Sequence, residues 1–299
     1  LKGTFANVGE VVLGLADVTL TSSAPDVVQV SPNQVMVARA PGNATITAAV
    51  GGKTATATVV VVPAPSVLVN RYSFNEAAGA TEVVDSVGGK NGTVYPDQSG
   101  TRTVTLGNGQ AVFPGGASFT EGAYIDLPDY LISNRNNVSI EIWATWTGPA
   151  DSVWSRIFDF GSSAKGDNPH NSGGGTASFW LSPRSGGGVL RFDAWNGATG
   201  YTLAGTSAMP RNQECHIVCI YAPDYGMSEL WLNGGRLDAQ PAAYALNTLQ
   251  DVNVWLGVSQ WDDVPFQGSI NEFRVYEGVL SETDIALRRR AGPDSLPND

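Results

Sequence analysis

The sequence predicts an all-β protein built from two antiparallel β-sandwiches, a small one followed by a much larger one. Three observations carry this prediction. The 35 glycines and 17 prolines are typical of many short strands joined by tight turns. Short runs of alternating apolar residues recur along the chain, with turn-forming residues between them. All eight tryptophans lie after residue 66, which indicates that the two parts have differently built cores.

Composition excludes several classes of function. The chain of 299 residues carries 17 basic and 28 acidic side chains, a formal charge of −11. An acidic surface repels phosphate backbones and anionic lipid heads, so we expect neither nucleic acid nor a membrane surface as partner. No apolar run approaches the roughly 18 residues of a transmembrane helix, so we expect no membrane insertion. Two histidines are too few for a multi-histidine metal site.

The two cysteines do not form a disulfide framework. Cys215 and Cys219 lie four positions apart on one predicted strand, which places them about 13 Å apart. That separation is too large for a single bridge. We therefore expect two small buried thiols, and the cysteines do not reveal the redox compartment.

The first part, residues 1–63, contains several short predicted strands. Turn signals separate them, and apolar residues alternate with other residues in two of them. Those alternating residues are Val35 and Val37 in one strand, and Ala44, Ile46, Ala48 and Val50 in the other. Residues 64–66 then form a short proline-containing linker. The pattern predicts a small β-sandwich.

Two stretches of this first part resemble bacterial Ig-like domains of the group-2 type. They are residues 21–30, TSSAPDVVQV, and residues 40–48, APGNATITA. The opening strand usual in that family is missing or truncated, and the chain begins abruptly in a strand-like segment. We therefore expect a mature or excised piece of a longer protein.

The second part, residues 67–292, contains about a dozen predicted strands and one helix, and a tail follows over 293–299. The helix spans 281–290, with Ser281 as N-cap, Asp284 three residues later, and Gly292 with Pro293 at its end. This composition predicts a large antiparallel sandwich. The strands are expected at 71–75, 123–127, 138–146, 156–160, 177–181, 189–195, 216–221, 229–232, 252–256 and 270–276.

Five pieces of this second part, in order, resemble the LamG-like jelly rolls of the concanavalin A-like lectin/glucanase superfamily. The resemblance covers about residues 67–292 and implies a jelly-roll fold. The chain departs from the family pattern at Glu214, where tryptophan is usual, and at Asn271, where aspartate is usual. The pieces are 71–76 with 85–92; 123–128; 138–143 with 156–161; 216–218 with 230–234; and 266–276.

No pattern of catalytic residues is evident. Glycosidases on this fold need two carboxylates facing one cleft, usually spaced two or four residues apart on one strand. Glu141 has no such neighbour, and Asp262 and Asp263 would point to opposite faces. His170 lies in a loop and we expect it to be solvated, whereas His216 begins an apolar strand and we expect a hydrogen-bonded structural role. The sequence therefore predicts no enzyme; a hydrolase or polysaccharide lyase with an unrecognised site is the alternative.

Sugar binding is better supported, because aromatic faces and planar polar groups occur together. Alternation places Arg191, Asp193 and Trp195 on one face of one predicted strand, and Trp231 on the polar face of another. Each face is either a ligand surface or an ordinary solvated sheet face.

Two loops add further candidates for sugar binding. They contain Tyr201, and Trp261 next to Asp262, and binding residues concentrate on loops held by a rigid scaffold. For Trp261 the alternative is packing under the loop that follows. The glycine triplets at 173–175 and 186–188 are predicted to be hairpin turns and not phosphate loops.

The resemblance also implies a structural Ca²⁺ that joins the loop after the first strand to the last strand. Calcium prefers several oxygen ligands from carboxylates and amides. The implied ligands are Asn75, Glu76, Asp85 and Asn271. The alternative is that Glu272 simply pairs with an arginine such as Arg274 or Arg71.

These observations together predict a non-catalytic glycan-binding or adhesion module of a larger secreted or cell-surface bacterial protein. The Ig-like part would serve as a spacer. The expected partner is a polysaccharide or glycoconjugate, or another extracellular protein. The alternative is a structural module for protein–protein contact or surface assembly without a small ligand.

Overall fold

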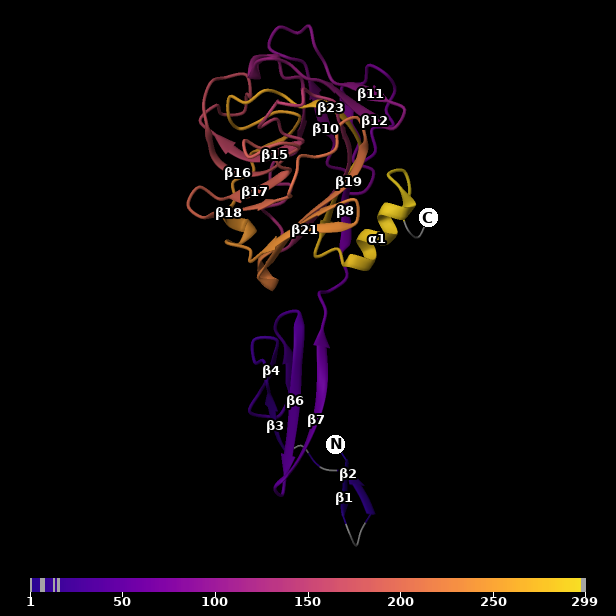
Figure 1. Cartoon of the computed structure of the whole chain (residues 1–299), viewed down its shortest axis with the longest axis vertical. Helices are drawn as coiled ribbons and strands as arrows, with labels where there is room; N and C mark the ends of the chain where they lie inside the picture. Colours follow the sequence, from indigo (N-terminus) through magenta and orange to yellow (C-terminus); the bar gives the residue numbers. More distant parts are fainter. Residues whose placement is uncertain (1, 6–8, 13, 15–16, 297–299) are drawn as a thin grey trace. The chain divides into compact units, whose positions relative to one another are not determined.

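The chain folds into two compact units, Leu1–Ala64 and Pro65–Asp299. The computed structural model describes residues 2–5, 9–12, 14 and 17–296. Strands make up nearly all regular structure in both units, as Figure 1 shows. The predicted all-β class is confirmed.

The smaller unit consists of short antiparallel strands around a small apolar cluster. In β6 the side chains of Ala44, Ile46 and Ala48 are buried, as the alternation predicts. The other alternating pair, Val35 and Val37, is 53% and 40% exposed, and only Val37 lies within a strand, Met36–Ala38. The described strands form a hairpin of β1 (Lys2–Phe5) and β2 (Gly9–Val12), a sheet in the order β3 (Thr19–Ser22), β6 (Gly42–Val50), β7 (Lys53–Val61), and a pair of β4 (Val28–Val30) and β5 (Met36–Ala38).

The larger unit is a sandwich of two antiparallel sheets. The first sheet has eight strands in the order β18 (Gly200–Ala204), β17 (Arg191–Trp195), β16 (Gly175–Ser182), β15 (Phe158–Ser163), β22 (Asn253–Leu256), β13 (Tyr124–Leu127), β10 (Gly92–Tyr95), β9 (Glu82–Val83). The second has the order β11 (Thr105–Gly107), β12 (Gln110–Pro114), β23 (Gln267–Glu277), β14 (Val138–Trp146), β19 (Glu214–Ala222), β20 (Met227–Leu232), β21 (Gly235–Gln240), and β8 (Val67–Tyr72) also pairs with β23.

Aromatic side chains fill the space between the two sheets. Phe158 of the first sheet and Phe273 of the second meet edge to face, with ring centroids 6.0 Å apart. Both rings are fully buried. Edge-to-face packing of this kind stabilises the core beyond the area it buries. The predicted buried thiols, Cys215 and Cys219, are free and belong to this core.

The outer face of the second sheet is covered by the helix α1 (Glu282–Ala291). Ser281 caps this helix, and Asp284 completes the capping box, as predicted. Ile285 of the helix is fully buried in a cluster with Val218 and Ile220 of β19. No helix in the described part of the chain has the length and apolar character needed to cross a membrane.

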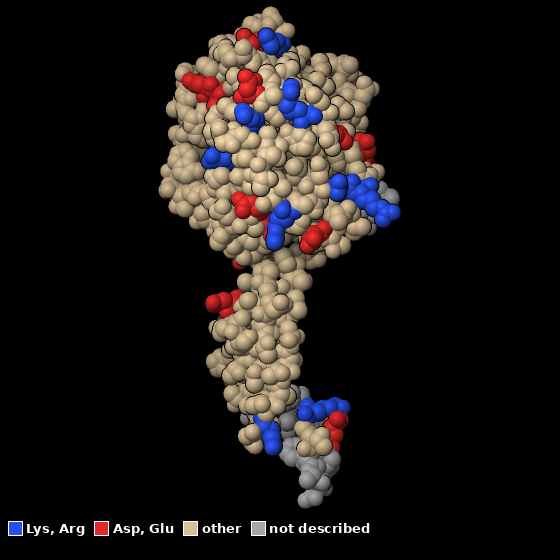
Figure 2. All heavy atoms as spheres, viewed as in Figure 1, with Lys and Arg blue, Asp and Glu red and all other residues tan. Residues whose placement is uncertain are grey.

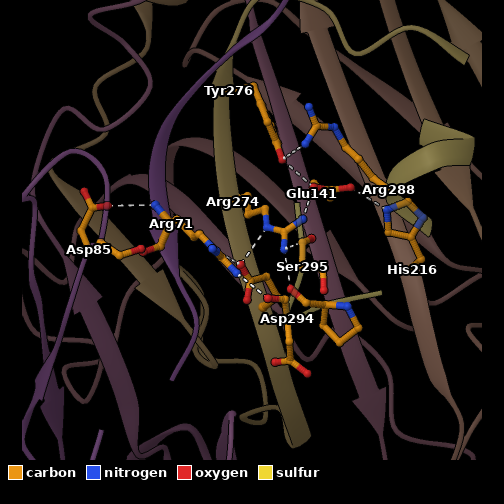
Figure 3. Close-up of polar contacts among 12 residues, drawn as sticks. Arg71, Asp85, Glu141, His216, Arg274, Tyr276, Arg288, Asp294 and Ser295 are labelled. Carbon is orange, nitrogen blue, oxygen red and sulfur yellow. Dashed lines mark hydrogen bonds and ion pairs between the residues drawn. The ribbon is translucent and has the colours of Figure 1, made fainter. Parts of the chain in front are cut away.

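A buried polar network also lies on this outer face of the second sheet (Figure 3). Glu141 accepts hydrogen bonds from His216 Nε2 at 3.0 Å, Arg274 Nη1 at 3.1 Å and Tyr276 Oη at 2.7 Å. Burial alone would raise the pKa of Glu141, but the hydrogen bond from His216 and the charge of Arg274 outweigh it and lower the pKa. His216 therefore has the structural role that the sequence predicts.

The same network extends to Glu272. Its Oε1 atom lies 2.5 Å from Arg71 Nε and 2.7 Å from Arg274 Nε, so Glu272 pairs with both arginines named in the alternative to calcium. The carbonyl groups of Asp294 and Ser295 accept further hydrogen bonds from these arginines at 3.1 Å (Figure 3). The C-terminal segment and the network together close this face of the sandwich.

Candidate functional site

The outer face of the first sheet is the side of the sandwich that carries an aromatic pocket. In β17, Phe192 and Ala194 point into the core, and Arg191, Asp193 and Trp195 point outward. Their partners on β16 are also outward, because a side chain and its cross-strand partner share a face. Trp180 lies opposite Asp193.

These outward residues, together with two loops, line a cavity of about 400 Å³, which we call the tryptophan pocket. The loop before β15 supplies Trp154 and Arg156, and the loop after β22 supplies Trp261 and Asp263. Trp180 is 4% exposed, and the other three tryptophans are partly exposed. The full lining is Trp154, Arg156, Ser178, Trp180, Arg191, Asp193, Trp195, Trp261 and Asp263.

Four of the predicted binding residues meet in this pocket: Arg191, Asp193, Trp195 and Trp261. Three others do not line it. Tyr201 pairs with Ala194 on the inward face of the first sheet and stacks on Tyr221 in the core, with centroids 5.5 Å apart. The expectation that Tyr201 lies in a loop is therefore wrong, because it belongs to β18.

Trp231 and Asp262 also serve elsewhere. Trp231 lies on the second sheet under α1, is 6% exposed, and donates from Nε1 to Glu229 at 2.8 Å. The geometry does not support a ligand-binding role for it, because the helix covers its face. Asp262 contacts Lys165 Nζ at 2.9 Å and accepts from Ser172 at 2.7 Å, so it braces the loop beside the pocket.

Sequence reasoning missed five lining residues. Trp180 and Ser178 could have been found by the alternation of β16, which places them on the same face. Trp154 carries no comparable signal, because it lies in a loop at φ 67°. Bulky residues rarely adopt this left-handed conformation, and when they do, the surrounding structure enforces it.

Both arginines of the tryptophan pocket are already paired with acids. Arg191 holds both carboxylate oxygens of Asp193, at 2.8 and 2.6 Å. Arg156 Nη2 lies 3.1 Å from Asp263 Oδ2, and its Nε lies 3.4 Å from the buried Asp159. The Arg156 guanidinium also stacks over Trp180, 4.0 Å from the ring centroid. Burial raises the pKa of Asp159 to about 7, although Arg156 opposes the rise.

Two glycines allow the tryptophans of the loops to lie flat against the backbone. A Cβ on Gly175 would lie 2.6 Å from the indole of Trp261, and a Cβ on Gly186 would lie 2.8 Å from the indole of Trp154. Real Cβ atoms do not come so close to another atom. The two glycines therefore leave the room that the indoles occupy, a role that the prediction of simple hairpin turns does not include.

A second cavity of about 430 Å³ lies on the same sheet, over β10 and β13. We call it the tyrosine cavity. Tyr95 is 41% exposed and stacks on Tyr124, with centroids 5.2 Å apart and planes 17° apart. His170 packs edge to face on Tyr124 and its Nε2 lies 2.7 Å from the Gly122 carbonyl, so the expectation of a solvated histidine is wrong. The lining is Tyr95, Pro96, Asp97, Gln98, Tyr124, Asp126, Asp167, Asn168 and His170.

Asp126 is the acid with the most perturbed environment in the tyrosine cavity. Burial, followed by the charges of Asp167 and Asp129, raises its pKa to about 7. Its Oδ1 atom is buried and has no hydrogen-bond partner in the structure. The wall of the cavity therefore contains a buried carboxylate oxygen that no group in the described part of the chain satisfies.

A cavity of about 730 Å³ is lined by loops and by the ends of β12, β14 and β23. Its arginine, Arg102, is paired with Glu121 at 3.2 Å. Its aromatic residue, Trp146, is 2% exposed. Because it offers no exposed aromatic face, it is a poorer candidate for binding sugar than the two smaller cavities.

The residues implied for calcium divide into two groups. Asp85 accepts hydrogen bonds from the Asn70 side chain at 2.7 Å and from four backbone amides, among them Arg71 and Gly88. Burial would raise its pKa, but these donors lower it. With its oxygens occupied in this way, Asp85 does not fit as a calcium ligand.

Asn75 and Asn271 fit better. Their Oδ1 atoms, and that of Asp294, each lie 3.5 to 3.6 Å from the point where a Cβ on Gly109 would stand. The Oδ1 atom of Asn271 is buried without a hydrogen-bond partner. Glu76 offers one free buried oxygen, Oε2, near the same loop. Among the described residues no cluster of three or more His, Cys, Asp or Glu side chains could hold a metal, so amide oxygens would have to contribute.

Residues 119–286 match the family model Laminin_G_3, described as the concanavalin A-like lectin/glucanases superfamily. The match covers more than half of the chain. The chain belongs to this superfamily. The matched residues include the four strands β15 to β18, which carry the tryptophan pocket. They also include most of the second sheet. No curated protein matches the sequence.

Several solved structures resemble the chain in fold. Domain 4 of AbnA, an extracellular GH43 arabinanase from Geobacillus stearothermophilus solved with arabinotriose, has a TM-score of 0.57 and 22% identity, over 74% of this chain and 98% of that one. The binding domain of botulinum neurotoxin DC, solved with rat synaptotagmin II, has a TM-score of 0.51 and 12% identity, over 75% and 51%. A CBM40 of a Ruminococcus gnavus sialidase has a TM-score of 0.46 and 20% identity, over 59% and 96%. The first two likenesses support the superfamily's jelly-roll fold.

Proposed function

We propose that this protein is a non-catalytic glycan-binding module of a larger extracellular or cell-surface bacterial protein, with a role in binding or adhesion. The observation that supports the proposal most directly is the tryptophan pocket, where three partly exposed indoles and several polar side chains meet on the outer face of the first sheet. Aromatic faces bind the apolar C–H side of a sugar ring, and polar groups beside them fix its hydroxyls.

The charges of the pocket favour a neutral sugar. Among the residues that line the pocket, Arg191 is paired with Asp193 and Arg156 with Asp263, so two negative charges match the two positive ones. A guanidinium that already holds a carboxylate has no fork left for a uronate or sialate. Figure 2 shows acidic and basic side chains scattered over the visible face of the larger unit, and most of that face carries neither.

The same ion pairs argue against hydrolysis. Retaining and inverting glycosidases need one acid that holds a proton and a second that is free to act as nucleophile or base. Both oxygens of Asp193 are bound by Arg191, and Asp263 is bound by Arg156 and Ser259. An enzyme remains the third hypothesis, and release of reducing sugar from a polysaccharide panel would establish it.

Removal of pocket tryptophans tests the proposal. Trp195→Ala and Trp261→Ala are each expected to weaken binding of a neutral oligosaccharide by about 1–3 kcal/mol, the scale of one lost aromatic contact. A glycan array followed by isothermal titration measures this. Tyr130→Ala, which removes a 53% exposed aromatic ring that lines neither cavity, is the control. Unchanged affinity in both tryptophan variants would contradict a site in this pocket.

The alternative function is a structural module for protein–protein contact or surface assembly without a small ligand. The absence of binding by the wild-type protein to any plant, algal or host glycan on an array would favour this alternative. For the smaller unit we propose the role of an Ig-like spacer, supported by the two sequence stretches and by its short antiparallel strands.

We further propose a structural Ca²⁺ at the loop around Gly109, held by Asn75, Asn271 and Asp294, with Glu76 nearby. Chelation by EDTA is expected to lower the melting temperature by several degrees, because an ion bound only to the folded state stabilises it by mass action. Differential scanning calorimetry measures the change, and Asp294→Ala should abolish it. No change in the wild type on chelation would remove calcium from the proposal.

A further inference from the structure

The tyrosine cavity has features of a binding site of its own, separate from the tryptophan pocket. Tyr95 presents an exposed ring face, and its other face rests on Tyr124. Tyr124 is in turn held edge to face by Trp255 and His170. A ring backed in this way is a rigid platform, so a ligand that stacks on it loses little freedom of the protein.

Two polar groups around this platform, on Asp126 and Asn168, form no hydrogen bond within the described part of the protein. Asp126 Oδ1 has no partner in the structure. Asn168 uses only its Oδ1 atom, which accepts from the backbone of His170 at 3.0 Å, and this leaves its Nδ2 donor free. No lysine or arginine lines the cavity. Free carboxylate and amide groups beside an exposed aromatic face are the combination that binds sugar hydroxyls, and the acids disfavour an anionic sugar.

Strand register places this cavity on the same face as the tryptophan pocket. One row of paired residues runs across the sheet from Asp193 and Trp180 through Asp159 and Trp255 to Asp126. Between β16 and β13 lie β15 and β22, three strand spacings, or roughly 14 Å. Asp159 and Trp255, in the middle of this row, are fully buried, so a polysaccharide that binds in both cavities would pass over the loops that cover these residues.

We infer that the tyrosine cavity is a second binding site for neutral saccharides, which makes the module bivalent for a polysaccharide. This inference rests on the proposed function, because it assigns the second site to the same class of ligand. Two linked sites raise the apparent affinity for a polymer without any new contact, since the second binding event becomes intramolecular.

The test uses the full chain, with arabinotriose, xylotriose, cellotriose and maltotriose as short probes and linear arabinan, xylan, mixed-linkage β-glucan and amylose as polymers. Isothermal titration is expected to give two sites per chain for a trisaccharide that binds. Tyr95→Ala should leave one of them, and the double variant Trp195→Ala/Trp261→Ala should leave the other. The matching polymer should bind at least tenfold more tightly than the trisaccharide, and either variant should abolish this gain.

Two control variants show whether a loss of binding in Tyr95→Ala is due to the loss of the aromatic ring in the tyrosine cavity. Tyr95→Phe preserves the ring face and should bind like the wild type, and Tyr130→Ala removes an exposed ring outside both cavities and should also do so. One site per chain that is insensitive to Tyr95→Ala would overturn the inference and leave the proposed function intact. Binding of none of these probes or polymers would overturn both.

Discussion

Glu141→Ala is expected to lower the free energy of unfolding of the larger unit by about 3–5 kcal/mol, the range for breaking a fully buried ion pair. Glu141 and Arg274 are both 0% exposed. Without this carboxylate, the buried charge of Arg274 is paired only with Glu272. The side chains of Tyr276 and His216 also lose the acceptor of their hydrogen bonds. Urea denaturation followed by tryptophan fluorescence measures the loss, and all eight tryptophans report on this unit alone.

Glu277→Ala is the matched control for this experiment. Glu277 pairs with Arg135 at 3.0 Å, but its side chain is 50% exposed, and exposed pairs contribute about 0–1 kcal/mol. If Glu141→Ala costs no more than Glu277→Ala, the network in Figure 3 does not hold the second sheet and the C-terminal segment together.

Gly175→Ala and Gly186→Ala are expected to weaken glycan binding at least tenfold while the fold is retained. Neither glycine has a positive φ, so alanine suits the backbone at both positions. The added methyl group would instead collide with the indole of Trp261 or Trp154 and turn it away from the ligand. A small displacement of a positioned aromatic group is enough to lose about 1.4 kcal/mol, which is a factor of ten.

Gly187→Ala provides the control on the same turn as Gly186. A Cβ at Gly187 would meet its nearest neighbours, in Ser185 and Val189, at 3.9 to 4.0 Å, an ordinary contact. Titration of all three variants with the same oligosaccharide, together with their melting temperatures, separates displaced indoles from lost stability. Wild-type affinity in Gly175→Ala and Gly186→Ala would show that binding does not depend on the close packing of the indoles against these glycines.

The strands that the sequence predicts in the larger unit all contribute side chains to its core. The run 138–146 is predicted with the same bounds as β14, because its inward positions are all apolar. Strands β9, β10, β11, β12, β18 and β21 are not predicted. In β21 five of the six residues are exposed, so this strand has no apolar face from which alternation could be recognised.

Part of the tryptophan pocket could be predicted in the same way. A two-residue period requires that Arg191, Asp193 and Trp195 share a face, whatever the sheet packs against. The same reasoning applied to Trp231 misleads, because the pattern of one strand does not reveal whether a helix covers that face. Tyr201 misleads for a related reason, since its cross-strand partner Ala194 places it in the core.

What the sequence determines by itself is the all-β class, the superfamily, the strands that face the core and the capped helix, because each depends on residues close together along the chain. Only the tertiary structure decides which outer sheet face is open, and that Trp154 and Trp261 meet β16 and β17 in one pocket. These features depend on strand order and loop conformation, such as φ 67° at Trp154. They arise from contacts between residues far apart in the sequence, for which no local pattern exists.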